Sequence, residues 1–150
     1  MSELRELYQS VILDHHRHPR NVGAPEGANR KASGVNPVCG DKVTVYLAVA
    51  EGAVREVGFS GSGCAISTAS ASLMTQAIKG KAVVEVEQVF ERFRELVTSE
   101  PRAEVDPSNL GKLAVFGGVR EFPVRVKCAT LAWHAMHAAL RGADQTVSTE

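Results

Sequence analysis

The chain has 150 residues, of which 44% are hydrophobic, and this suits one ordinary domain with a real core but hardly two. Its 17 Lys and Arg balance 17 Asp and Glu, and aromatic residues make up only 5%, so neither the basic excess nor the stacking rings of a nucleic-acid binder are present. No apolar run approaches the roughly 20 residues of a membrane span, and the N-terminus lacks the apolar stretch of a signal peptide. We therefore expect a cytoplasmic protein, a single domain over residues 1–150, with no nucleic-acid or membrane partner.

The first third of the chain is predicted to form a helix and then a long loop. Apolar side chains between Leu4 and His15 recur every three or four residues, the period of an amphipathic helix, and Pro19 ends it. Residues 19–38 contain Pro and Gly and show little periodicity. This indicates a surface loop, and long loops are often functional.

The middle of the chain is predicted to form a small sheet. Residues 43–49 alternate apolar and polar, Glu51 and Gly52 make a tight turn, and residues 54–60 form the second strand of a hairpin. Gly61 and Gly63 allow a sharp bend, after which we expect a third short strand.

The remainder is predicted to be helical. Apolar stripes mark helices over residues 66–78 and 86–97, a short helix runs from Asp106 until Gly117 and Gly118 break it, and a last helix runs from Pro123 to about Arg141. Residues 143–150 are expected to be a frayed tail. The fold class is therefore α+β, with a small antiparallel three-stranded sheet and helices packed on one of its faces.

Three cysteines in a reducing compartment disfavour a disulfide framework and indicate metal binding, catalysis or simple burial. Cys39 lies on a loop before a strand, Cys64 between a strand and a helix, and Cys128 on the apolar face of the last helix. Helix N-termini favour the thiolate, the form that binds metals and attacks sulfur. Burial as a small apolar side chain remains the alternative, above all for Cys128.

Asp41 follows Cys39 by two residues, so in extended backbone both side chains project to one face. With Cys64 and Cys128 they would complete a tetrahedral set of three sulfurs and one oxygen for a divalent cation. The alternative is that Asp41 caps the backbone of the loop. The separations between the cysteines match no zinc-finger spacing.

The histidines are less favoured as ligands. His15 continues the apolar stripe of the first helix, which indicates packing, and His134 and His137 follow Cys128 by more than a turn.

The ordered combination of these motifs resembles the IscU/NifU-type iron–sulfur cluster assembly proteins, and most closely their SufU branch. The resemblance covers about residues 4–141. The stretches that carry it include Pro19-Arg20-Asn21, Asn36-Pro37-Val38-Cys39-Gly40-Asp41, Gly61-Ser62-Gly63-Cys64 and Lys127-Cys128-Ala129-Thr130-Leu131. It implies a SufE/NifU-like α+β domain whose three cysteines converge at one end of the sheet. Cys39, Asp41, Cys64 and Cys128 match the metal-binding positions of the family.

Two departures from the IscU pattern matter for function. Lys127 stands where IscU-type scaffolds carry His, and the stretch between Cys64 and Cys128 is longer. Both features resemble SufU, which implies a zinc-bound sulfur acceptor. Such a protein takes persulfide sulfur from a SufS-like cysteine desulfurase and passes it toward cluster assembly or acceptor proteins, as a zinc-dependent sulfurtransferase. The oligomeric state is left open.

Cys39 is our candidate for the sulfur acceptor, because it lies on the most flexible loop beside Gly40. Arg125, one helical turn before Cys128, could stabilise the charge of a thiolate or persulfide; a solvated surface cation is an equal alternative for it. One alternative function is a scaffold that holds Fe²⁺ or a labile iron–sulfur cluster. Another, from a different class, is a structural zinc-binding interaction module with no exchangeable thiolate.

Overall fold

The computed structural model describes residues 2–99, 110–142 and 146–148. The elements in chain order are α1 (Ser2–Arg17), β1 (Arg30–Asn36), β2 (Asp41–Ala50), β3 (Ala53–Ser62), α2 (Ala65–Ile78), α3 (Val83–Thr98), the 3₁₀ helix η1 (Gly111–Glu121), α4 (Pro123–Leu140) and β4 (Thr146–Ser148). Within these ranges, no helix is long and apolar enough to cross a membrane.

The sheet has four strands in the order β3-β2-β1-β4. β2 pairs antiparallel with β1 and β3, whereas β4 pairs parallel with β1. The α+β class is confirmed, but the predicted three-stranded antiparallel sheet is wrong, because the described sheet is four-stranded and mixed. The expected third strand after the bend at residues 61–63 is absent from the described chain, since Gly61 and Ser62 simply extend β3.

Strand β1 lies inside the segment that the sequence predicted as a loop. Its inward positions are Ala32, Gly34 and Asn36, two small residues and one polar residue, so no apolar alternation marks it. Gly34 is needed because α4 passes close: a Cβ there would lie 3.0 Å from Cδ1 of Leu131. The predicted frayed tail likewise contains a strand, β4, whose pairing with β1 the sequence did not indicate.

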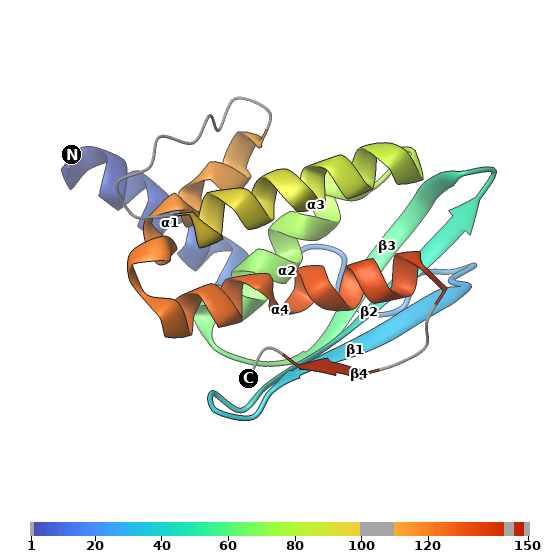
Figure 1. Ribbon diagram of the computed structural model, residues 1–150, viewed down its shortest axis with the longest axis horizontal. Coiled ribbons are helices and arrows are strands. Elements are labelled where there is room, and N and C mark those ends of the chain that lie inside the picture. The colour runs from blue at the N-terminus through green and yellow to red at the C-terminus, as the bar shows by residue number, and fades with distance from the viewer. Residues whose placement is uncertain (1, 100–109, 143–145, 149–150) are drawn as a thin grey trace.

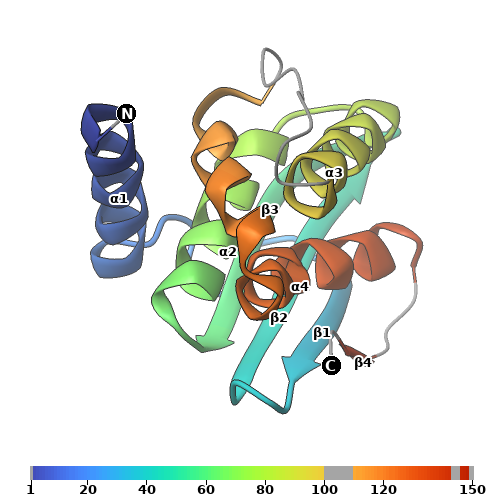
Figure 2. The ribbon, with the colours of Figure 1, turned by 60° about the vertical axis from the view of Figure 1, so that its left-hand side comes forward.

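The helices cover one face of the sheet (Figure 1). α4 lies across β1 and β2, α2 lies beside it and reaches β3, and α1 packs on the outer side of α2 (Figure 2). Trp133 of α4 is fully buried and stacks on Phe93 of α3 at 4.4 Å between ring centroids. The predicted last helix is confirmed from Pro123 to Leu140, whereas Gly117 and Gly118 do not break η1. The predicted start of that short helix at Asp106 lies outside the described residues.

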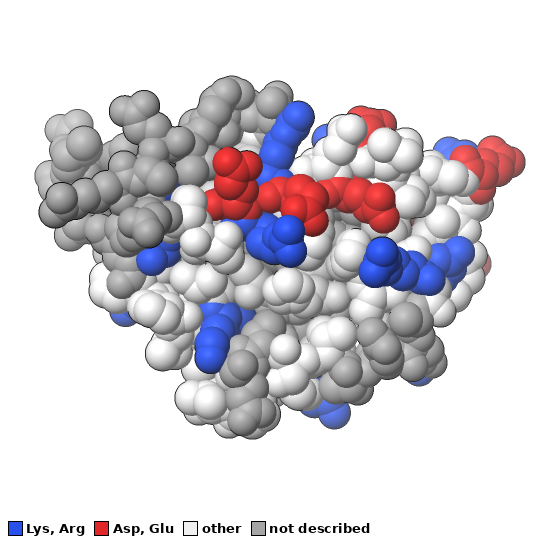
Figure 3. Space-filling model, in the orientation of Figure 1, with Lys and Arg blue, Asp and Glu red and all other residues white. Residues whose placement is uncertain are grey.

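Charges of both signs occur on the face seen in Figure 3. Acidic side chains gather over α3, with Lys and Arg beside and below them (Figure 3). The described part of this face therefore carries no broad field of one sign.

The arrangement brings three chain reversals to one end of the molecule. The turn between β1 and β2, the end of β3 with the start of α2, and the first turns of α4 all lie there (Figures 1 and 2). These are the segments that hold the three cysteines.

Candidate metal centre

The β1–β2 turn positions the first two predicted ligands. Asn36 pairs with Asp41 at the base of the hairpin, and the turn between them contains Cys39 and Gly40, whose φ is +73°. Cys39 is exposed, whereas Asp41, the first residue of β2, is only 3% exposed. A carboxylate buried this deeply requires partners, because burial of an unpaired charge is costly.

Cys64 supplies one of those partners and also caps α2. Its backbone N–H donates to Oδ1 of Asp41 at 2.9 Å, and its Sγ lies 3.6 Å from Oδ2 of the same carboxylate. The backbone N–H of Ser67 donates to the Cys64 sulfur at 3.4 Å, so that sulfur takes the N-cap position of α2. The positive end of the α2 dipole therefore faces the Cys64 sulfur.

Cys128 completes the group from α4. It is 4% exposed, and its Sγ lies 3.6 Å from Sγ of Cys39. The donor atoms of Cys39, Asp41 and Cys128 all lie within 4.8 Å of one another, and Cys64 adjoins this set through Asp41. The structure thus brings together all four residues that the sequence nominated.

The electrostatics of this cluster favour the binding of a cation. Burial raises the pKa of the Cys128 thiol, and the neighbouring thiols of Cys39 and Cys64 raise it further. Three thiols and a carboxylate cannot all ionise side by side without a positive charge between them. Three sulfurs and one oxygen are a donor set that zinc accepts, so the residues present fit that ion.

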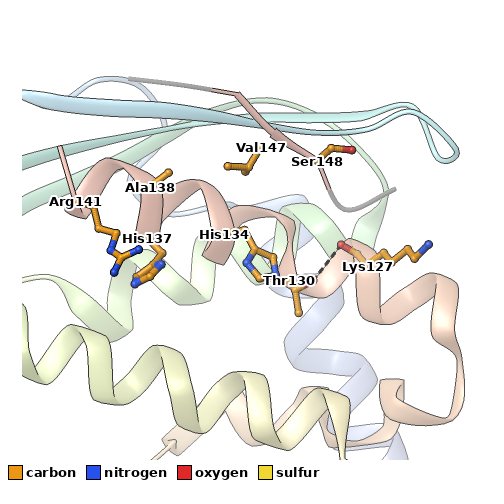
Figure 4. A pocket seen from close by; sticks show the side chains of 8 residues that line it. All are labelled: Lys127, Thr130, His134, His137, Ala138, Arg141, Val147 and Ser148. Atoms are coloured by element: carbon orange, nitrogen blue, oxygen red, sulfur yellow. Dashed lines mark hydrogen bonds between the residues drawn. The ribbon is translucent and has the colours of Figure 1, made fainter. Parts of the chain in front are cut away.

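The other charged candidates lie away from the sulfurs. The Arg125 guanidinium carbon sits 4.7 Å from the centre of the Phe122 ring, and both residues are exposed. No hydrogen bond or ion pair joins Arg125 or Lys127 to a thiol within the described chain. Lys127 is exposed at one end of a hollow of about 400 Å³ between α4 and β4, and its side chain points outward (Figure 4).

The histidines also take no part in the cluster. His134 and His137 line the same hollow (Figure 4), where His137 stacks on Phe90 at 4.6 Å. His15 is 1% exposed and its Nδ1 lies 2.7 Å from Oγ of Ser72, so the prediction that it serves packing is confirmed.

Sequence reasoning missed two residues of the site. Ser67 holds the Cys64 sulfur through its backbone N–H, and cysteine gives little signal as a helix cap because Ser, Thr, Asp and Asn are the usual ones. Asn36 is fully buried beneath the turn, with its Oδ1 accepting from the backbone N–H of Val38 at 3.2 Å. An Asn before Pro indicates a turn of this kind, but not its burial.

Comparison with known proteins agrees with this geometry. The sequence profile of the NifU-like N terminal domain matches residues 7–129. The chain is 39% identical over 136 residues to the zinc-dependent sulfurtransferase SufU of Bacillus subtilis strain 168, with 90% of each chain covered. It is 36% identical over 141 residues to the iron–sulfur cluster assembly scaffold protein IscU of Streptococcus pyogenes serotype M1, covering 94% of this chain and 87% of that one.

A solved structure extends the likeness to three dimensions. A protein from Fervidobacterium islandicum AW-1, described as a candidate iron–sulfur cluster assembly scaffold protein for the SUF system, superimposes with a TM-score of 0.79 at 33% identity, covering 87% of this chain and 93% of that one. Sequence profile, relatives and fold all agree, and the chain therefore belongs to the NifU-like N-terminal domain family, which includes its relatives named IscU and SufU.

Proposed function

We propose that this protein is a zinc-bound sulfur acceptor in iron–sulfur cluster assembly, working in the cytoplasm. The observation that carries the proposal is the convergence of Cys39, Asp41 and Cys128 at one end of the sheet, with 3.6 Å between the sulfurs of Cys39 and Cys128 and with the Cys64 sulfur 3.6 Å from the Asp41 carboxylate. The likeness to a relative named as a zinc-dependent sulfurtransferase supports it.

The three sulfurs differ in how freely they can move. Cys128 is buried on a helix, and Cys64 is held at the N-terminus of α2 by the backbone N–H of Ser67. Cys39 and Cys64 are both exposed, but Cys39 lies on a turn next to Gly40 and not at a helix terminus. Cys39 is therefore the sulfur that can meet a partner while the other two stay fixed.

Zinc, when bound, would hold these sulfurs as thiolates without redox chemistry of its own. The Cys39 thiolate attacks the terminal sulfur of a persulfide on a cysteine desulfurase. The sulfur–sulfur bond of the donor breaks, its cysteine leaves as a thiolate, and the transferred sulfur is then bonded to Cys39. Downstream assembly or acceptor proteins receive that sulfur.

A second candidate function is a scaffold for the cluster itself, which the likeness to relatives named as IscU scaffolds favours. Against it stands the donor set: Asp41 is a hard oxygen ligand, and the exposed Lys127 side chain points out of the hollow between α4 and β4 (Figure 4). Zinc also exceeds Fe²⁺ in affinity for such sites.

Metal analysis of protein purified without added metal tests the zinc site. We expect one zinc per chain and a lower melting temperature after chelation, because a metal that binds only the folded chain stabilises it by its binding free energy. Asp41→Ala should weaken zinc binding, and Asp14→Ala is the matched control, since the Asp14 carboxylate is half exposed and forms an ion pair with Arg20. An unchanged melting temperature after chelation, or unchanged zinc affinity in Asp41→Ala, contradicts this ligand set.

Two further assays separate the proposal from its alternatives. Anaerobic reconstitution with iron and sulfide beside stoichiometric zinc should give little stable visible absorbance; a stable cluster transferable to an apo-ferredoxin supports the scaffold instead. Alkylation of the zinc-loaded protein should reveal one fast thiol, at Cys39. Uniform protection of all three thiols supports a structural zinc module.

A further inference from the structure

The side chain of Asn36 carries a donor that the protein itself does not use. Asn36 is 0% exposed, and its Oδ1 accepts from the Val38 backbone N–H at 3.2 Å. Its Nδ2 is buried and has no hydrogen-bond partner in the structure. Buried polar groups are nearly always paired, so an unpaired amide nitrogen requires an explanation. A flip of the Asn36 amide would not help, because it would place the Nδ2 donor against the Val38 backbone N–H, which is also a donor.

The unpaired nitrogen belongs to the end of the sheet that carries the sulfurs. Asn36 follows Gly34 on the inward face of β1, and Gly34 meets Leu131 of α4. Leu131 lies one helical turn after Cys128. Across the hairpin Asn36 pairs with Asp41, and both residues are buried, so their side chains share the inner face.

The chemistry of the surrounding groups determines what can accept from this nitrogen. The polar side chains gathered at this end of the sheet are a carboxylate already bonded to the Cys64 backbone N–H, and three sulfurs of which two lie 3.6 Å apart. No sulfur of the described chain is in hydrogen-bond contact with Nδ2. A sulfur atom added to Cys39 would extend that side chain by one bond of about 2 Å, and would carry negative charge.

We propose that Asn36 is a binding residue for the transferred sulfur, with its Nδ2–H donating a hydrogen bond to the terminal sulfur of a Cys39 persulfide. This rests on the proposed function, because it requires Cys39 to accept sulfur. In the transfer, the Cys39 thiolate forms the new sulfur–sulfur bond and the donor cysteine leaves as a thiolate. Asn36 gives up no proton; its neutral donor stabilises the anionic sulfur without competing as a ligand for the metal.

A spectroscopic measurement tests the contact directly. In ¹H–¹⁵N spectra of the zinc-loaded full chain, one side-chain amide proton of Asn36 should move downfield when Cys39 is persulfurated with cysteine and a desulfurase. The Asn36→Ala variant assigns the signal. If peptide mass spectrometry finds the persulfide on wild-type Cys39 but the Asn36 signal stays in place, the contact does not exist. If no persulfide forms on wild-type Cys39, the proposed function fails instead.

The lifetime of the Cys39 persulfide tests whether the hydrogen bond from Asn36 stabilises it. Asn36→Asp keeps the oxygen that caps Val38 but replaces the donor with an acceptor, and Asn36→Ala removes both. We expect both variants to lose the persulfide to dithiothreitol about tenfold faster than wild type. Asn29→Asp is the matched control, since Asn29 bonds the backbone of Val49 with both its amide atoms at the other end of the sheet. A wild-type lifetime in Asn36→Asp, with destabilisation in Asn36→Ala alone, reduces Asn36 to a structural cap and overturns the proposal.

Discussion

The hydroxyl of Ser70 joins the two helices that position Cys64 and Cys128. Ser70 of α2 donates to the carbonyl of Ala129 at 2.5 Å and accepts from Nε1 of Trp133 at 3.1 Å. All three residues are 0% exposed, so no water can replace the hydroxyl. Ser70→Ala therefore leaves the indole N–H buried without a partner.

The loss of stability in Ser70→Ala can be worked out from these two hydrogen bonds. An unpaired buried donor costs about 1–3 kcal/mol, and the lost bond to Ala129 adds about 1 kcal/mol, because that carbonyl also belongs to the helix ladder. We expect a loss of about 3 kcal/mol in the free energy of unfolding, or roughly 6–12 °C in melting temperature for a chain of this size. Urea unfolding of the metal-free protein, followed by circular dichroism, measures it.

A double-mutant cycle isolates the contact from packing. Trp133→Phe alone leaves a cavity and removes the hydrogen bond that the Ser70 oxygen accepts, whereas in the Ser70→Ala background it removes a donor that already lacks its partner. Trp133→Phe should therefore lower the free energy of unfolding by at least about 1 kcal/mol less in the Ser70→Ala background than in wild type. The difference is the free energy of leaving one buried donor unpaired. Additive costs, or a loss below about 0.5 kcal/mol for Ser70→Ala, would refute this reasoning.

Three further predictions concern the cluster and α1. In Gly63→Ala the added Cβ would lie 2.9 Å from the Asp41 carboxylate. We expect zinc affinity to fall about 10- to 150-fold, which corresponds to the loss of one charge-assisted hydrogen bond. Gly118→Ala is the control, because its Cβ meets nothing within 4 Å and zinc titrations should stay unchanged. The metal-free chain should lose stability as pH rises above about 9.0. Burial raises the pKa of Cys128, so the folded state keeps a proton that the unfolded chain releases. In urea titrations, Cys128→Ala should reduce the dependence of the free energy of unfolding on pH in this range. The chain should also lose stability as pH falls below about 6.5, because burial lowers the pKa of His15 and only the unfolded chain then takes up its proton. If the free energy of unfolding of His15→Gln depends on pH in this range as strongly as that of wild type, this prediction is contradicted.

The sequence predicted the elements whose apolar pattern is strong. α4 and the β2–β3 hairpin were predicted because their inward residues are apolar at regular spacing. β1 was missed because a neighbouring helix packs so closely that its inward side chains must be small, as at Gly34. β4 was missed because a three-residue strand depends on its pairing with β1, which no local pattern encodes.

The site shows the same division. The sequence nominated four ligand candidates. The fold gathers the donor atoms of Cys39, Asp41 and Cys128 and sets Cys64 beside Asp41, because the motifs stand at chain reversals that meet at one end of the sheet. The roles of single atoms were not predictable. That Cys64 caps α2, and that Asn36 buries an unpaired donor, depend on contacts between residues far apart in the fold or on burial that local sequence does not reveal.

The central claim is that Cys39 accepts sulfur, and locating that sulfur tests it most directly. Zinc-loaded protein is incubated with cysteine and a cysteine desulfurase, alkylated, digested and analysed by mass spectrometry. We predict the mass of one added sulfur atom on the peptide that contains Cys39, and none in Cys39→Ser, which should remain folded and should no longer stimulate the desulfurase. The added sulfur found solely on the peptide that contains Cys128 would contradict the account.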